Sequence, residues 1–332
     1  MTDEKTKNRS PGRDRAVKAL PWLVLLAFLA AVQYGMGWEK VLQPWLTFHW
    51  PQLLLALGLM VLSYAVRTWR LVDYFPDEIG GRYPAALRLT LLHNLMNNLL
   101  PARTGEASFP LLMRRYFTVP YARSVSALLW FRLLDLHTIL CFAIYPLLVV
   151  TPFRRLVAPV LLLWLLLPLL LYWLRNRVEL YFAGRDGRLS TVMQQAMYGL
   201  PDSPLQFFKS WGLTWLNWLV KLGTLAWVLE QFVPAVSANM LIAGVIGGEL
   251  TSVLPFHAPV GVGTYEAGVI AALSGVALLP TATQGAINLH LFVLGSALLG
   301  GVLGWLIPVS GTSGTEVSTA PATTGIKTDD DA

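Results

Sequence analysis

Two charged residues in a Pro-Ala-Arg-Thr-Gly-Glu segment at positions 101–106 are the first candidates for ligand chemistry. The guanidinium of Arg103 offers a planar fork of N–H donors that suits a phosphate group. The free N–H groups of a helix that opens at Gly105 would add to such an anion site. Glu106 could pair with Arg103 in the empty site or bind an ammonium headgroup. The alternative is a self-neutralising pair that only fixes this segment to its neighbours.

A second candidate site is the Gly261-Val-Gly263 segment, which lies between Glu249 and Glu266. Glycine N–H groups ahead of a helix can form an anion-binding nest. Two carboxylates near one chain break could also carry protons, since burial favours their neutral form. The structural alternative is that Glu266 caps the helix in whose first turn it lies.

Three further charged residues fall inside apolar segments. Arg132 and Asp135 are three positions apart and share one helix face, so they either contact a substrate or form a local ion pair that lowers the cost of membrane insertion. Lys221 belongs to a polar stripe with Thr214 and Asn217, which must face the interior of a helix bundle rather than lipid. A functional role and internal pairing are both open for Lys221.

The sequence contains no residue set that is typical of a catalytic or cofactor site. Its single cysteine, Cys141, lies in an apolar run, so neither an intrachain disulfide nor a thiolate metal cluster is expected. The five histidines have no paired metal-binding spacing, and no Walker-type phosphate-binding loop occurs. We therefore expect no enzyme activity, no cofactor and no metal ion.

The composition indicates the environment in which these residues act. The chain has 332 residues, of which 55% are hydrophobic and 13% are charged, and its mean hydropathy is +0.54. A soluble domain carries about 25% charged residues, so an ordinary cytosolic enzyme, a disordered protein and a nucleic-acid-binding protein are excluded. Apolar runs that are long enough to cross a bilayer recur along the chain. The expected fold class is an all-α polytopic membrane protein.

The elements that must position the charged residues are six apolar spans and two interrupted stretches. The spans cover about 20–38, 52–69, 124–150, 156–174, 206–233 and 286–307. Residues 85–118 and 239–279 each resemble two short helices that meet at a Pro/Gly break, which is tolerated at membrane depth only where protein or a water-filled cavity satisfies the backbone. The transmembrane domain is expected at 19–308, between a disordered basic cytoplasmic tail (1–18) and a disordered acidic tail (309–332).

The distribution of Lys and Arg predicts the orientation. With both interrupted stretches treated as re-entrant hairpins, eighteen basic residues, Arg67 and Arg70 among them, lie on the side of the N-terminus and three lie on the other side. The positive-inside rule then places both termini in the cytoplasm. Each half, about 19–150 and 156–308, holds three spans and one hairpin, so the second half is inverted relative to the first, as in many transporters. If the hairpin arms cross fully, the chain has eight spans.

Several blocks of the sequence, taken in order, resemble a known family. Leu-Pro-Ala-Arg-Thr-Gly-Glu at 100–106, Arg-Leu-Leu-Asp at 132–135, Leu-Pro at 254–255 and Gly-Val-Gly-Thr-Tyr-Glu at 261–266 are similar to the hallmark blocks of the lysylphosphatidylglycerol synthase transmembrane (flippase-like) family. In full-length synthases this module resembles a flippase for aminoacylated phosphatidylglycerol and is followed by a soluble aminoacyl-transferase domain. Here the chain ends in a short acidic tail, so the resemblance implies a stand-alone translocation module. Residues 107–110 lack the basic residue of many members, which argues against a lysyl-lipid substrate.

The leading hypothesis is therefore a multi-pass translocator of the cell inner membrane that moves a phospholipid or lipid-linked anionic headgroup through a polar groove. An integral-membrane transferase or hydrolase acting on a lipid phosphate is the first alternative. A non-catalytic scaffold of a lipid or glycolipid pathway is the second. The expected partner is the membrane lipid, with no nucleic acid, and a homo-oligomer or a pathway partner remains open.

Overall fold

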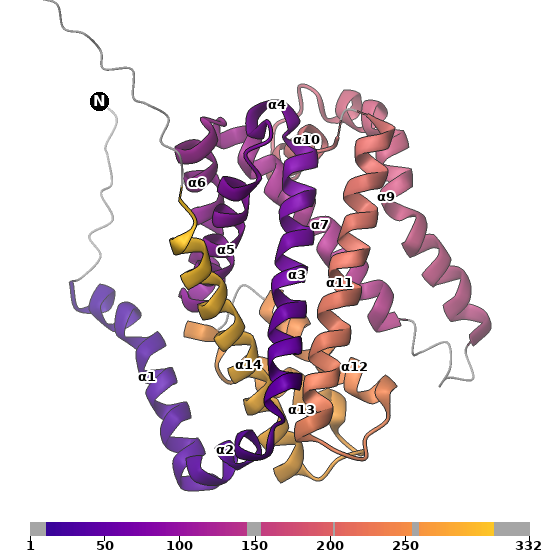
Figure 1. The fold of residues 1–332 in the computed structure, drawn as a ribbon. Helices are drawn as coiled ribbons and strands as arrows, with labels where there is room; N and C mark the ends of the chain where they lie inside the picture. The colour runs from indigo at the N-terminus through magenta and orange to yellow at the C-terminus, as the bar shows by residue number, and fades with distance from the viewer. Residues whose placement is uncertain (1–10, 145–153, 202, 254–258, 309–332) are drawn as a thin grey trace, which may run out of the picture.

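The computed structural model describes residues 11–144, 154–201, 203–253 and 259–308, in which every regular element is a helix (Figure 1). The helices are α1 (Pro11–Gly35), α2 (Trp38–Thr47), α3 (Trp50–Tyr74), α4 (Pro76–Ile79), α5 (Tyr83–Leu99), η1 (Pro101–Ala107), α6 (Ser108–Phe117), α7 (Tyr121–Ile144), α9 (Arg154–Phe182), α10 (Arg188–Tyr198), α11 (Pro204–Phe232), α12 (Ala238–Val253), η2 (Pro259–Gly261), α13 (Thr264–Leu273) and α14 (Leu279–Leu306). The expected all-α class is confirmed.

Four of these helices, α3, α7, α9 and α14, are long and apolar enough to cross a membrane. They correspond to four of the six expected spans. The helix α11 has 29 residues and follows the expected span at 206–233, but it carries the polar stripe of Lys221. In α1, the apolar part whose side chains are described is Leu23–Gly35. The tails 1–10 and 309–332, and the end of the expected span at 145–150, lie outside the described residues.

Three short helices, α2, α4 and α10, were not expected from the sequence. In Figure 1, α4 and α10 lie at the upper end of the bundle and α2 lies at the lower end. Each follows or precedes a long helix through a tight turn: Gly37, before α2, has φ +82°, and Gly80, after α4, has φ +42°. Left-handed backbone of this kind favours glycine. Hydrophobic spans alone did not reveal these connecting helices.

The two interrupted stretches are helical hairpins whose breaks meet inside the bundle. The helices α5 and α6 lie in the upper half of Figure 1, whereas α12 and α13 lie in the lower half. The short η1 and η2 segments, which join the arms, contact each other. Pro101 ends α5 because a residue before proline is pushed out of helical geometry, and Leu100 accordingly has ψ 138°. The first predicted break is thus confirmed. Of the second, Leu254 and Pro255 lie outside the described residues, whereas Gly261 and Gly263 have positive φ ahead of α13.

Small residues allow the hairpin arms to pack closely. A Cβ atom on Gly105 would lie 2.4 Å from the carbonyl oxygen of Met96 on α5. A Cβ on Gly247 of α12 would lie 2.3 Å from the carbonyl oxygen of Gly268 on α13. On α14, Gly300 packs against α3 and α5. Membrane helices associate through such small residues because lipid provides no hydrophobic force between them.

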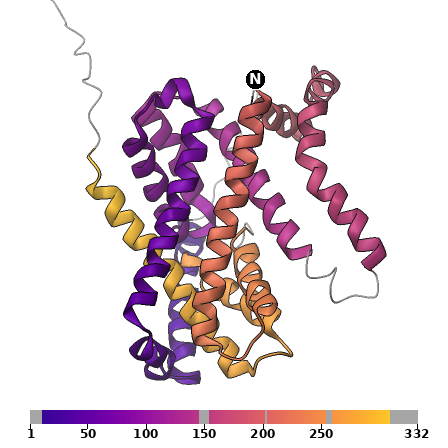
Figure 2. The ribbon, with the colours of Figure 1, turned by 45° about the vertical axis from the view of Figure 1, so that its right-hand side comes forward.

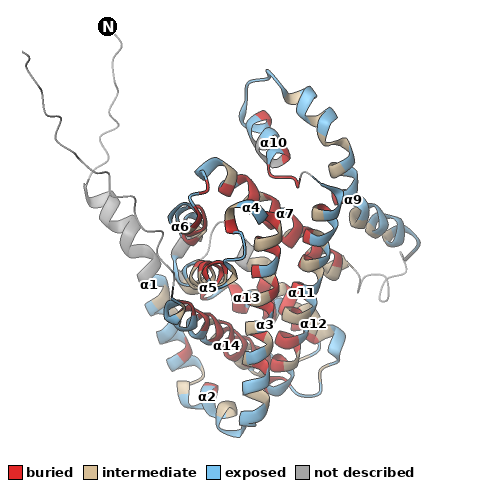
Figure 3. Ribbon diagram, turned by 45° about the horizontal axis from the view of Figure 1, so that its top comes forward, coloured by how far each residue is buried: buried red, intermediate tan, exposed pale blue. Residues whose placement is uncertain are grey.

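Burial separates the inner helices from the periphery (Figure 3). Of the most apolar window of α14, 61% is buried, whereas only 6% of the corresponding window of α9 is buried. In Figure 2, α9 stands at the edge of the molecule, beside α7 and apart from α14. The outward face of α9 is suited to lipid, and the charged residues gather among α3, α5, α7, α11, α12 and α14.

Candidate functional site

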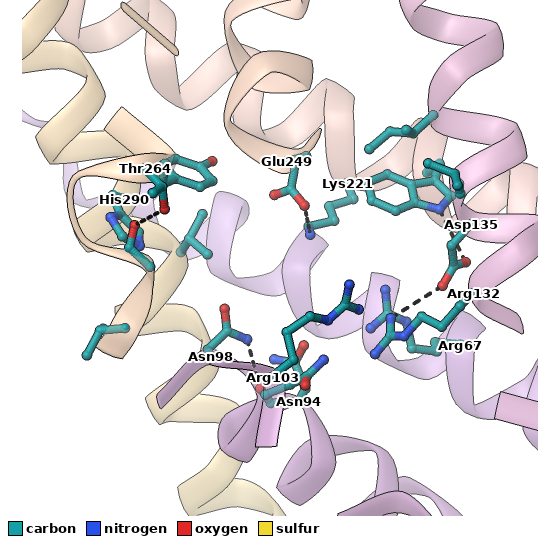
Figure 4. Close-up of a pocket in the computed structure, with 18 of the residues that line it drawn as sticks. Arg67, Asn94, Asn98, Arg103, Arg132, Asp135, Lys221, Glu249, Thr264 and His290 are labelled. Atoms are coloured by element: carbon teal, nitrogen blue, oxygen red, sulfur yellow. Dashed lines mark hydrogen bonds and ion pairs between the residues drawn. The ribbon is translucent and has the colours of Figure 1, made fainter. Parts of the chain in front are cut away.

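A polar cavity of about 220 Å³ lies where the two hairpin breaks meet the inner helices (Figure 4). We call it the polar cavity, and its charged and polar lining residues are Arg67, Asn94, Asn97, Asn98, Arg103, Arg132, Asp135, Lys221, Glu249, Thr264, Tyr265 and His290. Figure 4 shows Arg103, Asn94 and Asn98 on one side, Lys221 and Glu249 opposite, Arg67, Arg132 and Asp135 to the right, and Thr264 and His290 to the left.

At the first break, the carboxylate of Glu106 contacts three polar side chains. The Glu106 Oε1 atom accepts hydrogen bonds from Arg103 Nη2 at 2.8 Å and from Asn97 Nδ2 at 3.1 Å, and Arg132 Nη2 of α7 lies 2.8 Å away. Glu106 itself is not among the lining residues of the polar cavity. Glu106 therefore fixes Arg103 and Arg132, which do line the cavity, from outside the cavity wall. The pair with Arg103 was predicted, and the contact with Arg132 also links η1 to α7.

The two breaks share an unusual backbone feature. Arg103 in η1 has φ +58° and Val260 in η2 has φ +66°, so both residues occupy the left-handed region without being glycine. Such residues cost free energy and concentrate at functional sites. Both line the polar cavity.

Asp135 is the centre of a buried network rather than a simple local partner of Arg132. Its Oδ1 accepts from Arg70 Nη1 at 2.9 Å and from Trp218 Nε1 at 3.3 Å. Arg132 Nη1 lies 3.6 Å from Oδ2, so the predicted pair with Arg132 is present but is longer. Arg70 Nη1 also donates to Thr214 Oγ1 at 2.6 Å. This network ties α3 to α7 and α11.

Arg67 and Arg70, which were counted with the basic residues on the side of the N-terminus, lie inside the helix bundle. The helix α3 continues to Tyr74, five residues beyond the expected end of the span, and carries both arginines into the bundle. Arg70 is only 4% exposed, and Arg67 lines the polar cavity. Apolar scoring ended the span early because it treats an arginine as a boundary, whereas ion pairing with Asp135 offsets the cost of burying Arg70.

Arg67 differs from Arg70, Arg103 and Arg132 because it has neither a hydrogen bond nor an ion pair within the described part of the chain. Its Nε atom is buried without a partner. Around the polar cavity, five cationic side chains (Arg67, Arg70, Arg103, Arg132 and Lys221) face three carboxylates (Glu106, Asp135 and Glu249). The cluster therefore has two positive charges in excess before the His290 pair, described below, is counted.

Lys221 of α11 forms an ion pair with Glu249 of α12. Lys221 Nζ lies 2.6 Å from Glu249 Oε2 and 5.0 Å from the centre of the Trp218 ring. Glu249 is buried, and both residues line the polar cavity. The polar stripe predicted on α11 does face the interior, since Thr214 and Asn217 are buried as well.

Glu266 caps the helix α13, as the structural interpretation predicted. Its Oε2 accepts the Gly263 N–H at 2.7 Å, and its Oε1 lies 2.7 Å from His290 Nδ1. Neither Glu266 nor Gly263 is a lining residue, whereas Gly261 is. The predicted anion nest needs correction, because the Gly263 N–H is already taken by Glu266.

Gly105 also needs correction. The helix α6 begins at Ser108 and not at Gly105, and Gly105 is buried against α5 and does not line the polar cavity. Glycine is needed at position 105 for steric reasons, because α5 leaves no room for a side chain, and not for binding an anion. Of the predicted site residues, the cavity wall holds Arg103, Arg132, Asp135, Lys221, Glu249 and Gly261.

Two histidines were missed because isolated histidines in apolar helices carry no spacing signal. His290 lines the polar cavity and bonds Glu266. His93 Nδ1 lies 2.9 Å from Ser108 Oγ, and Ser108 donates to the Gly105 carbonyl at 2.6 Å, so His93 is the donor to Ser108. The described residues hold no group of three or more His, Cys, Asp or Glu side chains suited to a metal ion.

Long apolar helices around a charged internal cavity define a polytopic α-helical membrane protein. A family model described as the lysylphosphatidylglycerol synthase TM region matches residues 18–301. The chain belongs to this family, which associates it with lipid headgroups at the membrane. No protein with curated annotation matches the chain.

Proposed function

We propose that this protein translocates a phospholipid or a lipid-linked anionic headgroup across the membrane through the polar cavity. The observation that carries the proposal is Arg67, a cation at the cavity wall with no partner among the described residues. A charge at bilayer depth costs at least about 2.5–3.5 kcal/mol on insertion scales. An unpaired arginine there needs an anion that the described residues do not supply.

The architecture supports transport through two inverted halves. In chain order, α1, α3, the α5–α6 hairpin and α7 are followed by α9, α11, the α12–α13 hairpin and α14. The two hairpins occupy opposite halves of the bundle in Figure 1, and their breaks contact each other. Six spans with two re-entrant hairpins fit this order. A substrate site at the interface of inverted repeats, near broken helices, is the usual arrangement in such transporters.

The charges favour an anionic headgroup. Phosphate is matched by the forked donors of arginine, and three arginines, Arg67, Arg103 and Arg132, line the polar cavity. The headgroup would cross within the cavity while the acyl chains stay in lipid. This route avoids taking a bare phosphate through hydrocarbon, where no partner would compensate its charge.

The orientation follows the corrected charge distribution. Without Arg67 and Arg70, sixteen basic residues still lie on the side of the N-terminus, against three on the other side. In Figure 1, α14 ends in the upper half of the molecule, toward α10, and α1 begins at about mid-height, above α2. We therefore propose that the end with α10 faces the cytoplasm and that the protein resides in the inner membrane.

Reconstitution tests the proposal directly. The purified chain is placed in phosphatidylcholine vesicles that contain a fluorescent phosphatidylglycerol, and lipid exposed on the outer leaflet is quenched with dithionite. Arg103→Ala and Arg132→Ala should each slow lipid movement at least about tenfold, because a charge-assisted hydrogen bond contributes about 1.5–3 kcal/mol. Each change leaves Glu106 with the other arginine, so the fold should be retained.

Arg177→Ala is the matched control, since Arg177 is exposed on α9 and away from the polar cavity. Lipid movement at the wild-type rate in both cavity variants would refute the proposal. Mass spectrometry of the recovered lipid separates transport from the enzyme alternative, because only an enzyme would alter the lipid covalently.

A further inference from the structure

The pair formed by His290 and Glu266 is placed between the polar cavity and the second helix break. Glu266 is buried; its Oε2 accepts the Gly263 N–H at 2.7 Å, and its Oε1 lies 2.7 Å from His290 Nδ1. His290 is buried on α14, and its ring lines the polar cavity. The pair thus connects the cavity with the N-terminus of α13.

The hydrogen bonds determine where a proton can bind. Glu266 Oε2 already accepts the Gly263 N–H, so the proton shared by the two side chains lies between Oε1 and His290 Nδ1, and we assign it to Nδ1 because imidazole is a stronger base than carboxylate. His290 then carries its hydrogen on Nδ1, and its Nε2 is the basic atom. Nε2 has no hydrogen bond within the described residues and lies beside Gly261 at the cavity. His290 Nε2 is therefore the atom of the pair that is open to an additional proton.

The groups around the pair are few. The Tyr265 ring stacks on His290 with centres 4.5 Å apart, and Glu249 on α12 is held by Lys221 of α11. Arg103 comes from η1, which contacts η2. Across the polar cavity lie the remaining arginines and Asp135. Apart from the pair itself, these charges sum to an excess of two cations when the cavity is empty.

We propose, resting on the function proposed above, that His290 and Glu266 form a proton-binding site whose occupancy is coupled to that of the anionic headgroup. Without the extra proton, the pair has charge −1 and partly balances the excess cations. An anion in the polar cavity takes over that role, because it lowers the positive potential at His290. The imidazolium–carboxylate pair, with charge zero, then becomes favourable, and the headgroup binds together with a proton.

Coupling of this kind is reciprocal. If the anion increases the affinity of His290 for a proton, the proton must increase the affinity of the cavity for the anion by the same factor. The pair also contacts the second helix break, because Glu266 accepts the Gly263 N–H at the start of α13. Binding of a proton is consequently linked to the second helix break, which lines the cavity. Through this coupling, a proton gradient can drive translocation of the lipid across the membrane.

Calorimetry of the full chain tests the proton site independently of transport. Dihexanoyl-phosphatidylglycerol is titrated into detergent-solubilised protein at pH 7 in Tris, HEPES and MOPS, whose ionisation enthalpies differ. The dependence of the heat on the buffer gives the number of protons taken up. We expect net uptake of up to about one proton per lipid in the wild type and none in Glu266→Gln or in His290→Gln.

The variants are designed to keep the fold. In Glu266→Gln, the amide oxygen can still accept the Gly263 N–H, and in His290→Gln the Glu266 cap is untouched. His137→Gln is the matched control, because His137 is also a buried histidine but bonds the Trp164 carbonyl outside the polar cavity. It should take up protons as the wild type does.

In the vesicle assay, movement of lipid should depend on pH by up to about tenfold per pH unit for a single coupled proton. Both site variants should lose this dependence. Lipid binding without proton uptake in the wild type, or uptake that persists in both site variants, would overturn the inference and leave the proposed function intact. Absence of lipid binding and of lipid movement would instead overturn both.

Discussion

Arg67 and Arg70 lie one helical turn apart on α3 and should respond oppositely to the same substitution. Arg70 bonds Asp135 and Thr214, whereas Arg67 has no hydrogen bond or ion pair among the described residues. Methionine removes the charge and keeps much of the side-chain length. Comparing the two methionine variants therefore distinguishes an arginine that stabilises the fold from an arginine that binds a ligand.

For Arg70→Met, we expect a loss of about 3 kcal/mol in the free energy of unfolding. Breaking a buried ion pair costs about 3–5 kcal/mol because the remaining charge loses its compensation. The lower end applies here, since Trp218 and Arg132 remain beside Asp135. Denaturant titration in detergent, followed by tryptophan fluorescence, measures this change.

For Arg67→Met, stability should be unchanged or higher by up to about 1 kcal/mol, because no partner is orphaned and a buried charge is removed. Lipid movement should nevertheless fall about 10- to 150-fold, as a charge-assisted contact of about 1.5–3 kcal/mol is lost. The excess charge around the polar cavity drops from two to one. A variant that moves lipid normally, or that unfolds as easily as Arg70→Met, would refute the assignment of Arg67 to a ligand.

Two further predictions concern packing and orientation. Gly105→Ala should lower the thermal stability of the protein sharply, because the new Cβ would lie 2.4 Å from the Met96 carbonyl oxygen. Gly58→Ala on α3 is the control, because no atom lies within 4 Å of its new Cβ. It should be neutral or mildly stabilising in the same thermal unfolding assay. In a Cys141→Ala background, a membrane-impermeant thiol reagent added to intact cells should label Glu39→Cys on α2 and not Leu189→Cys on α10. Inside-out vesicles should give the reverse, and equal labelling of both positions from one side would contradict the proposed orientation.

Several features were determined by the sequence alone because their causes are local. The fold class followed from the composition, since a chain with so few charged residues cannot form a soluble surface of its own. The break at Pro101 followed from the steric effect of proline on the residue before it. The inward face of α11 followed from helical periodicity, which places Thr214, Asn217 and Lys221 on one side. The last two inferences need only neighbours on the same helix.

The roles of the charged residues were decided by tertiary structure, because their partners are distant in sequence. Arg70 meets Asp135 and Thr214, which lie 65 and 144 positions away. No local pattern distinguishes it from Arg67, which has the same residue type, the same helix and a nearby position. Only the packing of α3 against α7 and α11 gives one arginine a carboxylate and leaves the other at the wall of the polar cavity.

The same reason explains the candidates that changed their role. Glu106 was expected either to contact a substrate or to pair with Arg103, and it pairs with both Arg103 and Arg132 without lining the cavity. Glu266 was recognisable as a helix cap from its position, but its partner His290 is 24 residues away on another helix. Helical phase shows that a side chain points inward. The identity of the group that it meets there depends on how separate helices pack, and this is not encoded in any one segment of the chain.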